Sequence, residues 1–168
     1  RGVRRRSTAR RHRVRRSADV RRDVLAAAGS LRRLGVGPGD RVGVVGPNGT
    51  RYLTIDVAIG LVGAVAVPLY ATSPPGEIAE IVDGSGARLL FVGSAQLLGR
   101  LPRFADAIRI VSFCRQDGWS ATDVETWEAF LACGESVGVE GLPAPVGPDD
   151  VATIRYTSGT TGSPKGVM

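Results

Sequence analysis

The sequence has few of the side chains from which metal centres and nucleophilic relays are built. It contains one histidine, His12, and two cysteines, Cys114 and Cys133, which are far from a C-x-x-C spacing. A zinc site, a disulfide framework and a Ser-His-Asp relay are therefore not supported. We expect both cysteines to be ordinary, buried or half-buried thiols of a reducing compartment, and the protein to be cytoplasmic.

An uninterrupted apolar run of membrane-spanning length is also missing. The longest apolar stretch, residues 53–69, contains Asp56 and Pro68 and is shorter than a comfortable span. The pattern favours a buried helix that leads into a buried strand. With 168 residues, of which 43% are hydrophobic, the chain is long enough for one domain with a substantial core.

Acidic residues are scarce at the beginning of the chain. The first 22 residues hold eleven arginines and one acid, Asp19, whereas the rest of the chain holds eleven basic and fifteen acidic residues. The net charge of +6 therefore comes from an arginine-rich head. We expect this head, residues 1–16, to be disordered and its histidine, His12, to be solvated.

Several roles for the arginine-rich head stay open. Its composition is compatible with a tail for nucleic acid or an anionic membrane, with a transit peptide, and with a solvated end or translated sequence outside the fold. A twin-arginine export signal is not supported, because no apolar segment follows the arginine pairs. No aromatic residue lies between the arginines, so we expect no specific nucleic-acid partner, while peripheral membrane association stays open.

Helical and strand-like patterns alternate from Ser17 onward. The first helix is predicted over residues 17–34, with Ser17 as N-cap and Gly35 as terminator. Further helices are predicted over residues 52–62, 77–83 and 124–132, and strands over residues 42–45, 64–69, 88–92, 108–113 and 151–156. This alternation predicts an α/β fold with a layered, mostly parallel sheet and flanking helices, whose ligands bind at the carboxyl ends of the strands.

The chemically most informative segment is the last one, residues 156–168, with the sequence YTSGTTGSPKGVM. Its glycines let the backbone approach a ligand closely, its hydroxyls and N–H groups donate to phosphate oxygens, and its lysine supplies a compact cation. The pattern is typical of a phosphate-binding loop, although it is not a Walker A loop. The alternative is a surface loop that is merely rich in serine, threonine and glycine.

The terminal segment closely resembles the phosphate-loop signature of the AMP-forming acyl-adenylate synthetases, which include acyl-CoA synthetases, luciferases and peptide-synthetase adenylation domains. The segment GVGPGDRVGVV, with Asp40, and the following GPNG, with Asn48, resemble the early core of that superfamily. Residues 63–92 are similar to long-chain fatty-acid–CoA ligases, above all in the Val-Pro-Leu-Tyr run at residues 67–70. The resemblance implies that residues 17–168 are the N-terminal part of an AMP-binding domain, cut after the phosphate loop.

The resemblance also implies a two-step reaction with ATP, Mg²⁺ and coenzyme A. A carboxylate, expected to be that of a fatty acid, attacks the α-phosphate of ATP, and the acyl group then passes to a thiol. Lys165 would be the catalytic cation near the phosphates, and Thr157 would help to hold Mg²⁺. The β- and γ-phosphates would be wrapped by the loop between them, Ser158, Gly159, Thr160, Thr161 and Gly162.

Three classes of function stay open on the sequence. The first is an acyl-CoA ligase, and the second is an adenylating enzyme with another acceptor, such as a carrier-protein thiol or a reductase domain. The third is an inactive truncated remnant or a nucleotide- or nucleic-acid-binding piece. Because the chain stops at Met168, we expect the strand that should follow the loop to be missing, ATP binding to be weak and this chain alone to be inactive.

Arg155 departs from the resemblance, because relatives usually carry an aliphatic residue at this point of the strand. Strand alternation places Arg155 on the same face as Val151 and Thr153. Two structural interpretations stay open, a solvated face and an acidic partner. A functional interpretation is a contact with a phosphate or a carboxylate.

Overall fold

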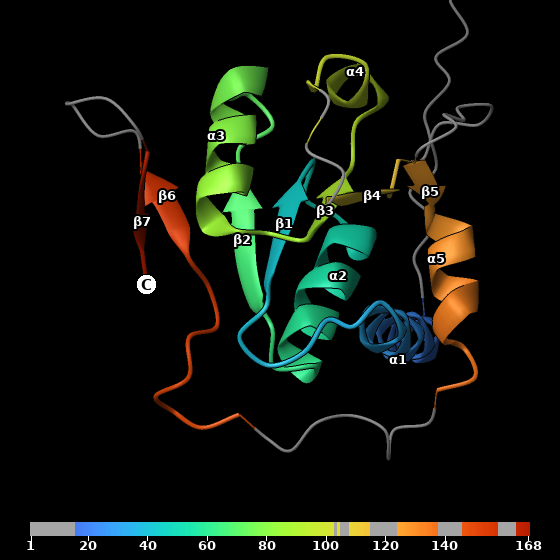
Figure 1. Cartoon of the computed structure of the whole chain (residues 1–168). Coiled ribbons are helices and arrows are strands. Elements are labelled where there is room, and N and C mark those ends of the chain that lie inside the picture. Colours follow the sequence, from blue (N-terminus) through green and yellow to red (C-terminus); the bar gives the residue numbers. More distant parts are fainter. Residues whose placement is uncertain (1–15, 103, 105–107, 115–123, 138–145, 158–163) are drawn as a thin grey trace, which may run out of the picture.

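Five parallel strands form the centre of the fold, in the order β2-β1-β3-β4-β5 (Figure 1). The computed structural model describes residues 16–102, 104, 108–114, 124–137, 146–157 and 164–168. The five strands are β1 (Arg41–Val45), β2 (Val65–Leu69), β3 (Leu89–Val92), β4 (Arg109–Ser112) and β5 (Val124–Thr126). The fold class predicted from the sequence, α/β with a mostly parallel sheet, is confirmed.

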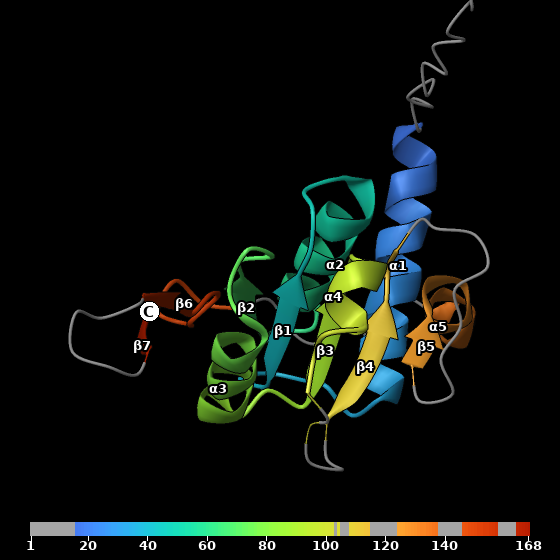
Figure 2. The ribbon, with the colours of Figure 1, turned by 90° about the horizontal axis from the view of Figure 1, so that it is seen from above.

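Helices cover both faces of the sheet (Figure 2). One face carries α1 (Ser17–Arg33), α2 (Thr50–Leu61) and α5 (Trp127–Gly134), and the other carries α3 (Pro75–Ser85) and the short α4 (Ala95–Leu98). Successive strand residues point to opposite faces, so Val44 packs with the first group of helices and Val45 with the second. The result is a three-layer α/β/α arrangement with two hydrophobic cores.

The first predicted helix is confirmed almost residue for residue, as α1. It ends before Gly35, which has a φ of 75° and so adopts the left-handed conformation that favours glycine. The N-cap prediction is wrong, because Ser17 is already helical and Arg16 precedes it without a side-chain cap.

The helix predicted over residues 124–132 is partly wrong. Residues Val124–Thr126 form β5, which extends the sheet beside β4. The helix begins only at Trp127, because the Thr126 hydroxyl accepts a hydrogen bond from the Ala129 N–H at 3.2 Å and caps it. Pairing with β4 and capping by Thr126 together override the helical pattern.

The run at residues 53–69 divides into α2 and β2, as predicted, but α2 is not fully buried. Its outer face exposes Leu53, Val57 and Leu61 to between 37% and 54%. None of the helices in the described part of the chain combines the length and the apolar character that crossing a membrane requires. Cys114 and Cys133 are half-buried and free, as predicted.

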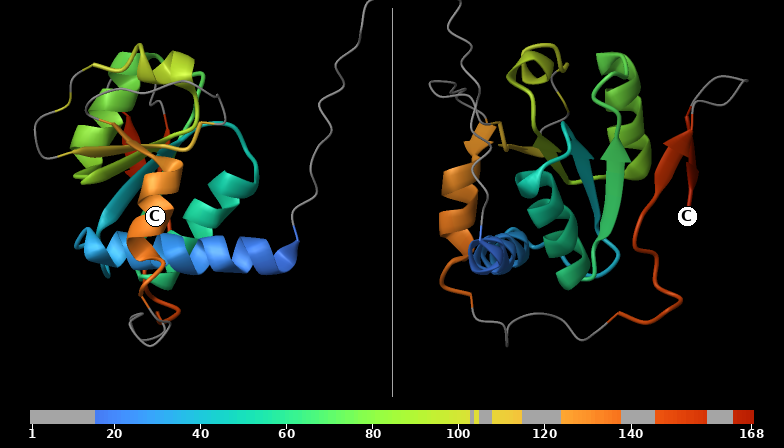
Figure 3. Two further views of the ribbon diagram at one scale, coloured as in Figure 1. Left: turned by 90° about the vertical axis from the view of Figure 1, so that its right-hand side faces the viewer. Right: turned by 180° about the vertical axis from the view of Figure 1, so that it is seen from behind.

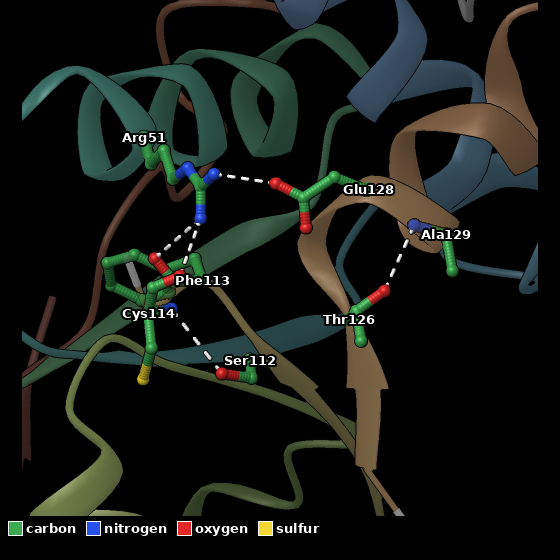
Figure 4. A network of polar contacts seen from close by, with 7 residues as sticks. All are labelled: Arg51, Ser112, Phe113, Cys114, Thr126, Glu128 and Ala129. Carbon is green, nitrogen blue, oxygen red and sulfur yellow. Dashed lines mark hydrogen bonds and ion pairs between the residues drawn. The ribbon is translucent and has the colours of Figure 1, made fainter. Parts of the chain in front are cut away.

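Arg51 connects α2 to β4 and α5 (Figure 4). Its Nη1 donates to the carbonyl oxygens of Phe113 at 3.2 Å and Cys114 at 2.7 Å, and its Nη2 lies 2.7 Å from Glu128 Oε1. The guanidinium also lies 5.7 Å from the centre of the Trp127 ring. One side chain thereby ties the start of α2, the end of β4 and the start of α5 together.

Candidate phosphate-binding site

A separate antiparallel hairpin flanks the predicted phosphate loop. Strand β6 (Arg155–Thr157) pairs with β7 (Lys165–Val167), and Thr157 lies opposite Lys165. Of the residues between the two strands, only Pro164 is described. The loop residues predicted to contact phosphates lie outside the described part of the chain, so these predictions stay predictions: Ser158, Gly159, Thr160, Thr161 and Gly162. Figure 3 shows the hairpin at the flank of the fold, on the side of β2.

The expectation that no strand follows the loop is wrong. Residues Lys165–Val167 are enough to pair with β6 along its whole length. Gly166 lies opposite Tyr156, and a Cβ on Gly166 would come within 3.2 Å of the tyrosine Cζ and 3.0 Å of Ile154 Cγ2. The absence of a side chain at Gly166 therefore lets the Tyr156 ring pack across β7.

The chain reaches the hairpin along the free edge of β2. The Ala66 N–H donates to the Ala152 carbonyl at 3.0 Å, and the Ile154 N–H donates to the Ala66 carbonyl at 2.9 Å. This parallel bridge would continue with a bond from residue 68, but Pro68 has no N–H to donate. The chain therefore separates from β2 at this point, near the carboxyl end of the sheet.

Thr157 and Lys165 present a hydroxyl and a cation at the two ends of the loop. Because residues directly opposite each other in an antiparallel pair project to the same face, the two side chains share one side of the hairpin. Both residues are exposed. Lys165 is also the one lysine in the sequence, in which arginine supplies all the other basic side chains.

Two cavities border β6, and neither was predicted from the sequence. The first, of about 440 Å³, is lined by Gly46, Pro47, Asn48, Tyr52, Pro68, Leu69, Tyr70, Ala71, Arg155 and Tyr156. The second, of about 460 Å³, is lined by Tyr70, Thr72, Ser73, Pro74, Glu77, Tyr156 and Thr157. The turn residues that follow β1 and β2 could have predicted a site here, since they mark the carboxyl ends of two parallel strands.

Comparison with known proteins shows the family. Residues 15–168 match the family described as AMP-binding enzyme.

The chain belongs to the AMP-binding enzyme family.

Two curated relatives of this chain are ligases of coenzyme A or acyl-CoA synthetases by name. One, from Mycobacterium tuberculosis, is a propanoyl:CoA ligase whose acyl group carries a methyl-dioxo-octahydroindenyl ring. It is 34% identical over 163 residues, which are 90% of this chain and 31% of the relative. The other, long chain acyl-CoA synthetase 3 from Arabidopsis thaliana, is 34% identical over 161 residues, which are 89% of this chain and 24% of the relative. The chain thus spans about a quarter to a third of these two proteins.

A solved structure agrees with the fold of this chain. The acyl-CoA synthetase of Brucella canis superposes with a TM-score of 0.72 at 22% identity, over 89% of this chain and 27% of that one. At this identity the likeness shows the fold. The recognition made from the terminal segment, an AMP-binding enzyme similar to acyl-CoA synthetases, is confirmed by the family match.

Metal-binding side chains do not gather at any point in the described part of the chain. No cluster of three or more histidine, cysteine, aspartate or glutamate side chains occurs among the described residues. Mg²⁺ usually keeps several waters and takes one or two protein ligands together with phosphate oxygens. The exposed Thr157 hydroxyl, opposite Lys165 in the hairpin, fits such a minor role.

Tyr52 is the residue of the first cavity with a shifted pKa. Its half-buried ring meets Phe113 edge to face, with centroids 6.3 Å apart. Burial raises the pKa of the Tyr52 phenol, the negative charge of Asp56 raises it further, and the positive charge of Arg155 opposes both. Tyr52 therefore stays protonated at neutral pH and presents an O–H donor.

Proposed function

We propose that this chain supplies the phosphate-binding hairpin of an enzyme that activates a carboxylic acid with ATP and transfers the acyl group to coenzyme A. The observation behind the proposal is the register of the hairpin, in which Thr157 pairs with Lys165. This register places Thr157 and Lys165, at the two ends of a glycine- and hydroxyl-rich segment, opposite each other, which supports a phosphate-binding role for that segment. The names of the curated relatives support the transfer to coenzyme A.

Lys165 acts on the phosphates in this proposal. Its ammonium is a compact charge on a flexible stem, suited to several phosphate oxygens in turn. Negative charge grows on the leaving pyrophosphate when the carboxylate attacks the α-phosphate, and a cation placed there lowers the energy of that transition state. The N–H and hydroxyl groups of residues 158–162 would donate to the β- and γ-phosphates.

Mg²⁺ would neutralise phosphate charge beside the Thr157 hydroxyl when it is bound. Thr157 is one oxygen ligand at most, so the phosphates and water would complete the coordination. This chain would then act by positioning, because the hairpin fixes the backbone positions from which the Thr157 and Lys165 side chains project.

We propose a fatty acid as the acid that is activated. The run at residues 67–70 supports this choice, since it resembles long-chain fatty-acid–CoA ligases. A different acceptor, such as a carrier-protein thiol or a reductase domain, and an inactive remnant are the alternatives. Tyr70 of this run lines both cavities beside β6, so its surroundings would be close to the reacting groups.

The single lysine gives a direct test. Reductive methylation with isotope-labelled formaldehyde keeps the positive charge and labels Lys165 together with the N-terminal amine, and the Lys165 signal is identified by its absence in Lys165→Ala. In NMR titrations of the labelled 168-residue chain, pyrophosphate and ATP with Mg²⁺ should shift the Lys165 signal saturably, whereas AMP should not. A Lys165 signal that responds equally to AMP, or to none of the three, would contradict the proposed role.

A further inference from the structure

Arg155 has no task in the proposed phosphate site. It lies in β6, two residues before Thr157, and its side chain is exposed. Within the described part of the chain, no acidic side chain lies within ion-pair distance of its guanidinium. Of the structural interpretations drawn from the sequence, the described residues support the solvated face.

The surroundings of Arg155 form a cavity with mixed chemistry. Five of the lining residues carry polar groups at the end of a side chain that can donate a hydrogen bond: Asn48, Tyr52, Tyr70, Arg155 and Tyr156. Prolines and aliphatic side chains make up much of the remaining wall: Pro47, Pro68, Leu69 and Ala71. The wall is about as polar as it is apolar, so it can contact both the polar and the apolar part of a small molecule, and about 440 Å³ is within the usual range of volumes for such a site.

The cavity exists because two strands separate. The ladder between β2 and the chain that leads into β6 stops at Pro68, which lacks the N–H for the next bond. Pro68 and Arg155 both line the cavity. The end of the backbone ladder at Pro68 thus leaves room for the cavity. Arg155, the first residue of β6, brings a positive charge to it.

We propose that this cavity binds an oxyanion carried on a small apolar group, with Arg155 as the anion-binding residue and Tyr52 and Asn48 as flanking donors. A guanidinium presents two parallel N–H groups to a carboxylate or a phosphate, and such charge-assisted bonds are stronger than neutral ones. Asp56 is the acidic group that acts on Tyr52, and it is not among the residues that line the cavity. This inference does not rest on the proposed function, because Lys165 and the loop take no part in it.

The test uses the intact 168-residue chain and three probes without nucleotide. Hexanoate and hexyl phosphate share the apolar tail and differ in the oxyanion, while acetate has the carboxylate without the tail. Binding is followed through the backbone amide signals of Asn48 and Arg155 in NMR titrations at constant ionic strength. The variants are Arg155→Leu and Arg155→Lys in the cavity, with Arg109→Leu as the control outside it. Lys165→Ala is added to distinguish this cavity from the hairpin loop.

We expect at least one hexyl probe to bind saturably and more tightly than acetate, and Arg155→Leu to weaken it by about tenfold or more. If hexanoate binds more tightly, the oxyanion is a carboxylate, and if hexyl phosphate does, it is a phosphate. Arg155→Lys should keep part of the affinity, and the Arg109→Leu control should keep it within about twofold. Since Arg155 is exposed, thermal unfolding should show that Arg155→Leu is folded.

Three results would overturn the proposal. The first is the absence of saturable binding by both hexyl probes. The second is an unchanged affinity in Arg155→Leu. The third is a loss of affinity in Lys165→Ala with none in Arg155→Leu, which would place the anion on the hairpin loop and leave the proposed function intact.

Discussion

The ring of Phe113 lies against Gly93 so closely that a Cβ on Gly93 would overlap two of its carbon atoms. Gly46 approaches the same ring from the neighbouring loop, with its own Cβ position 2.7 Å from Phe113 Cζ. Gly46 follows β1 and Gly93 follows β3, the two strands between which the strand order reverses. Ligands often bind at such a switch point, but here Phe113 fills it, and the cavities lie over β2 and β6.

Gly93→Ala should therefore destabilise the fold. The added methyl group has to displace the Phe113 ring from a closely packed position, and overpacking of this kind costs about 1 to 3 kcal/mol. Urea unfolding at equilibrium measures the change. Gly99→Ala is the matched control, because its Cβ would meet nothing closer than 3.7 Å, and it should leave the free energy of unfolding nearly unchanged.

Arg51 and Glu128 should contribute unequally to stability, although they form one ion pair. Arg51→Gln loses the bonds to the Phe113 and Cys114 carbonyls as well as the pair, so we expect a loss of about 1 to 3 kcal/mol. Glu128→Gln loses an exposed pair, since 72% of the Glu128 side chain is accessible, and should cost less than about 1 kcal/mol. Equal losses in urea unfolding would show that the carbonyl contacts of Arg51 contribute nothing.

The raised pKa of Tyr52 predicts a loss of stability in alkali. The folded state holds the phenol proton more tightly than the unfolded state, so this contribution is complete below the usual pKa of 10.0 and is lost as the pH rises above it. The free energy of unfolding of the native chain should therefore fall relative to that of Tyr52→Phe above about pH 10. Parallel curves for the two proteins across this range would contradict the assignment.

Removal of residues 1–15 should leave the folded part unchanged. Arg16 is kept, because its carbonyl accepts the N–H groups of Asp19 and Val20 at the start of α1. The removed segment carries eight arginines, so salt-sensitive binding to heparin or DNA should disappear with it. A clear drop in the thermal unfolding temperature would show that the head contributes to the fold.

The 168-residue chain alone should release no AMP from ATP in the presence of Mg²⁺, fatty acids and coenzyme A. It spans 31% and 24% of two ligase relatives, and the described residues hold no acidic cluster for a metal. An AMP assay with Lys165→Ala as background decides the matter. Steady release above that background would show that the chain is sufficient for adenylation.

The alternation of apolar runs and turns was enough to predict the layered sheet, and the terminal segment was enough to predict the family. The apolar pattern did not predict where α5 begins or that β7 forms. Thr126 caps α5 from a strand, and so moves the helix start by three residues from the predicted one. Strand β7 is short and fully exposed, so no apolar periodicity marks it.

The candidate cavity was beyond sequence reasoning for a related reason. Tyr52, Pro68 and Arg155 come from three elements far apart in the sequence, and only the order of the strands brings them together. The sequence does show that Arg155 is unusual for a buried strand. It cannot show that the neighbouring strand lacks a donor at Pro68 on the side that faces Arg155.

Pro68 has a second consequence, for encounters between copies of the chain. An edge strand with free N–H and C=O groups is a template on which another strand can assemble, and this is a common route to aggregation. Along the outer edge of β2, the groups of Ala66 are already bonded, and the next outward position, Pro68, has no hydrogen to offer. A foreign strand would find no donor there, so one imino acid both ends the sheet of the single molecule and blocks its continuation into the next.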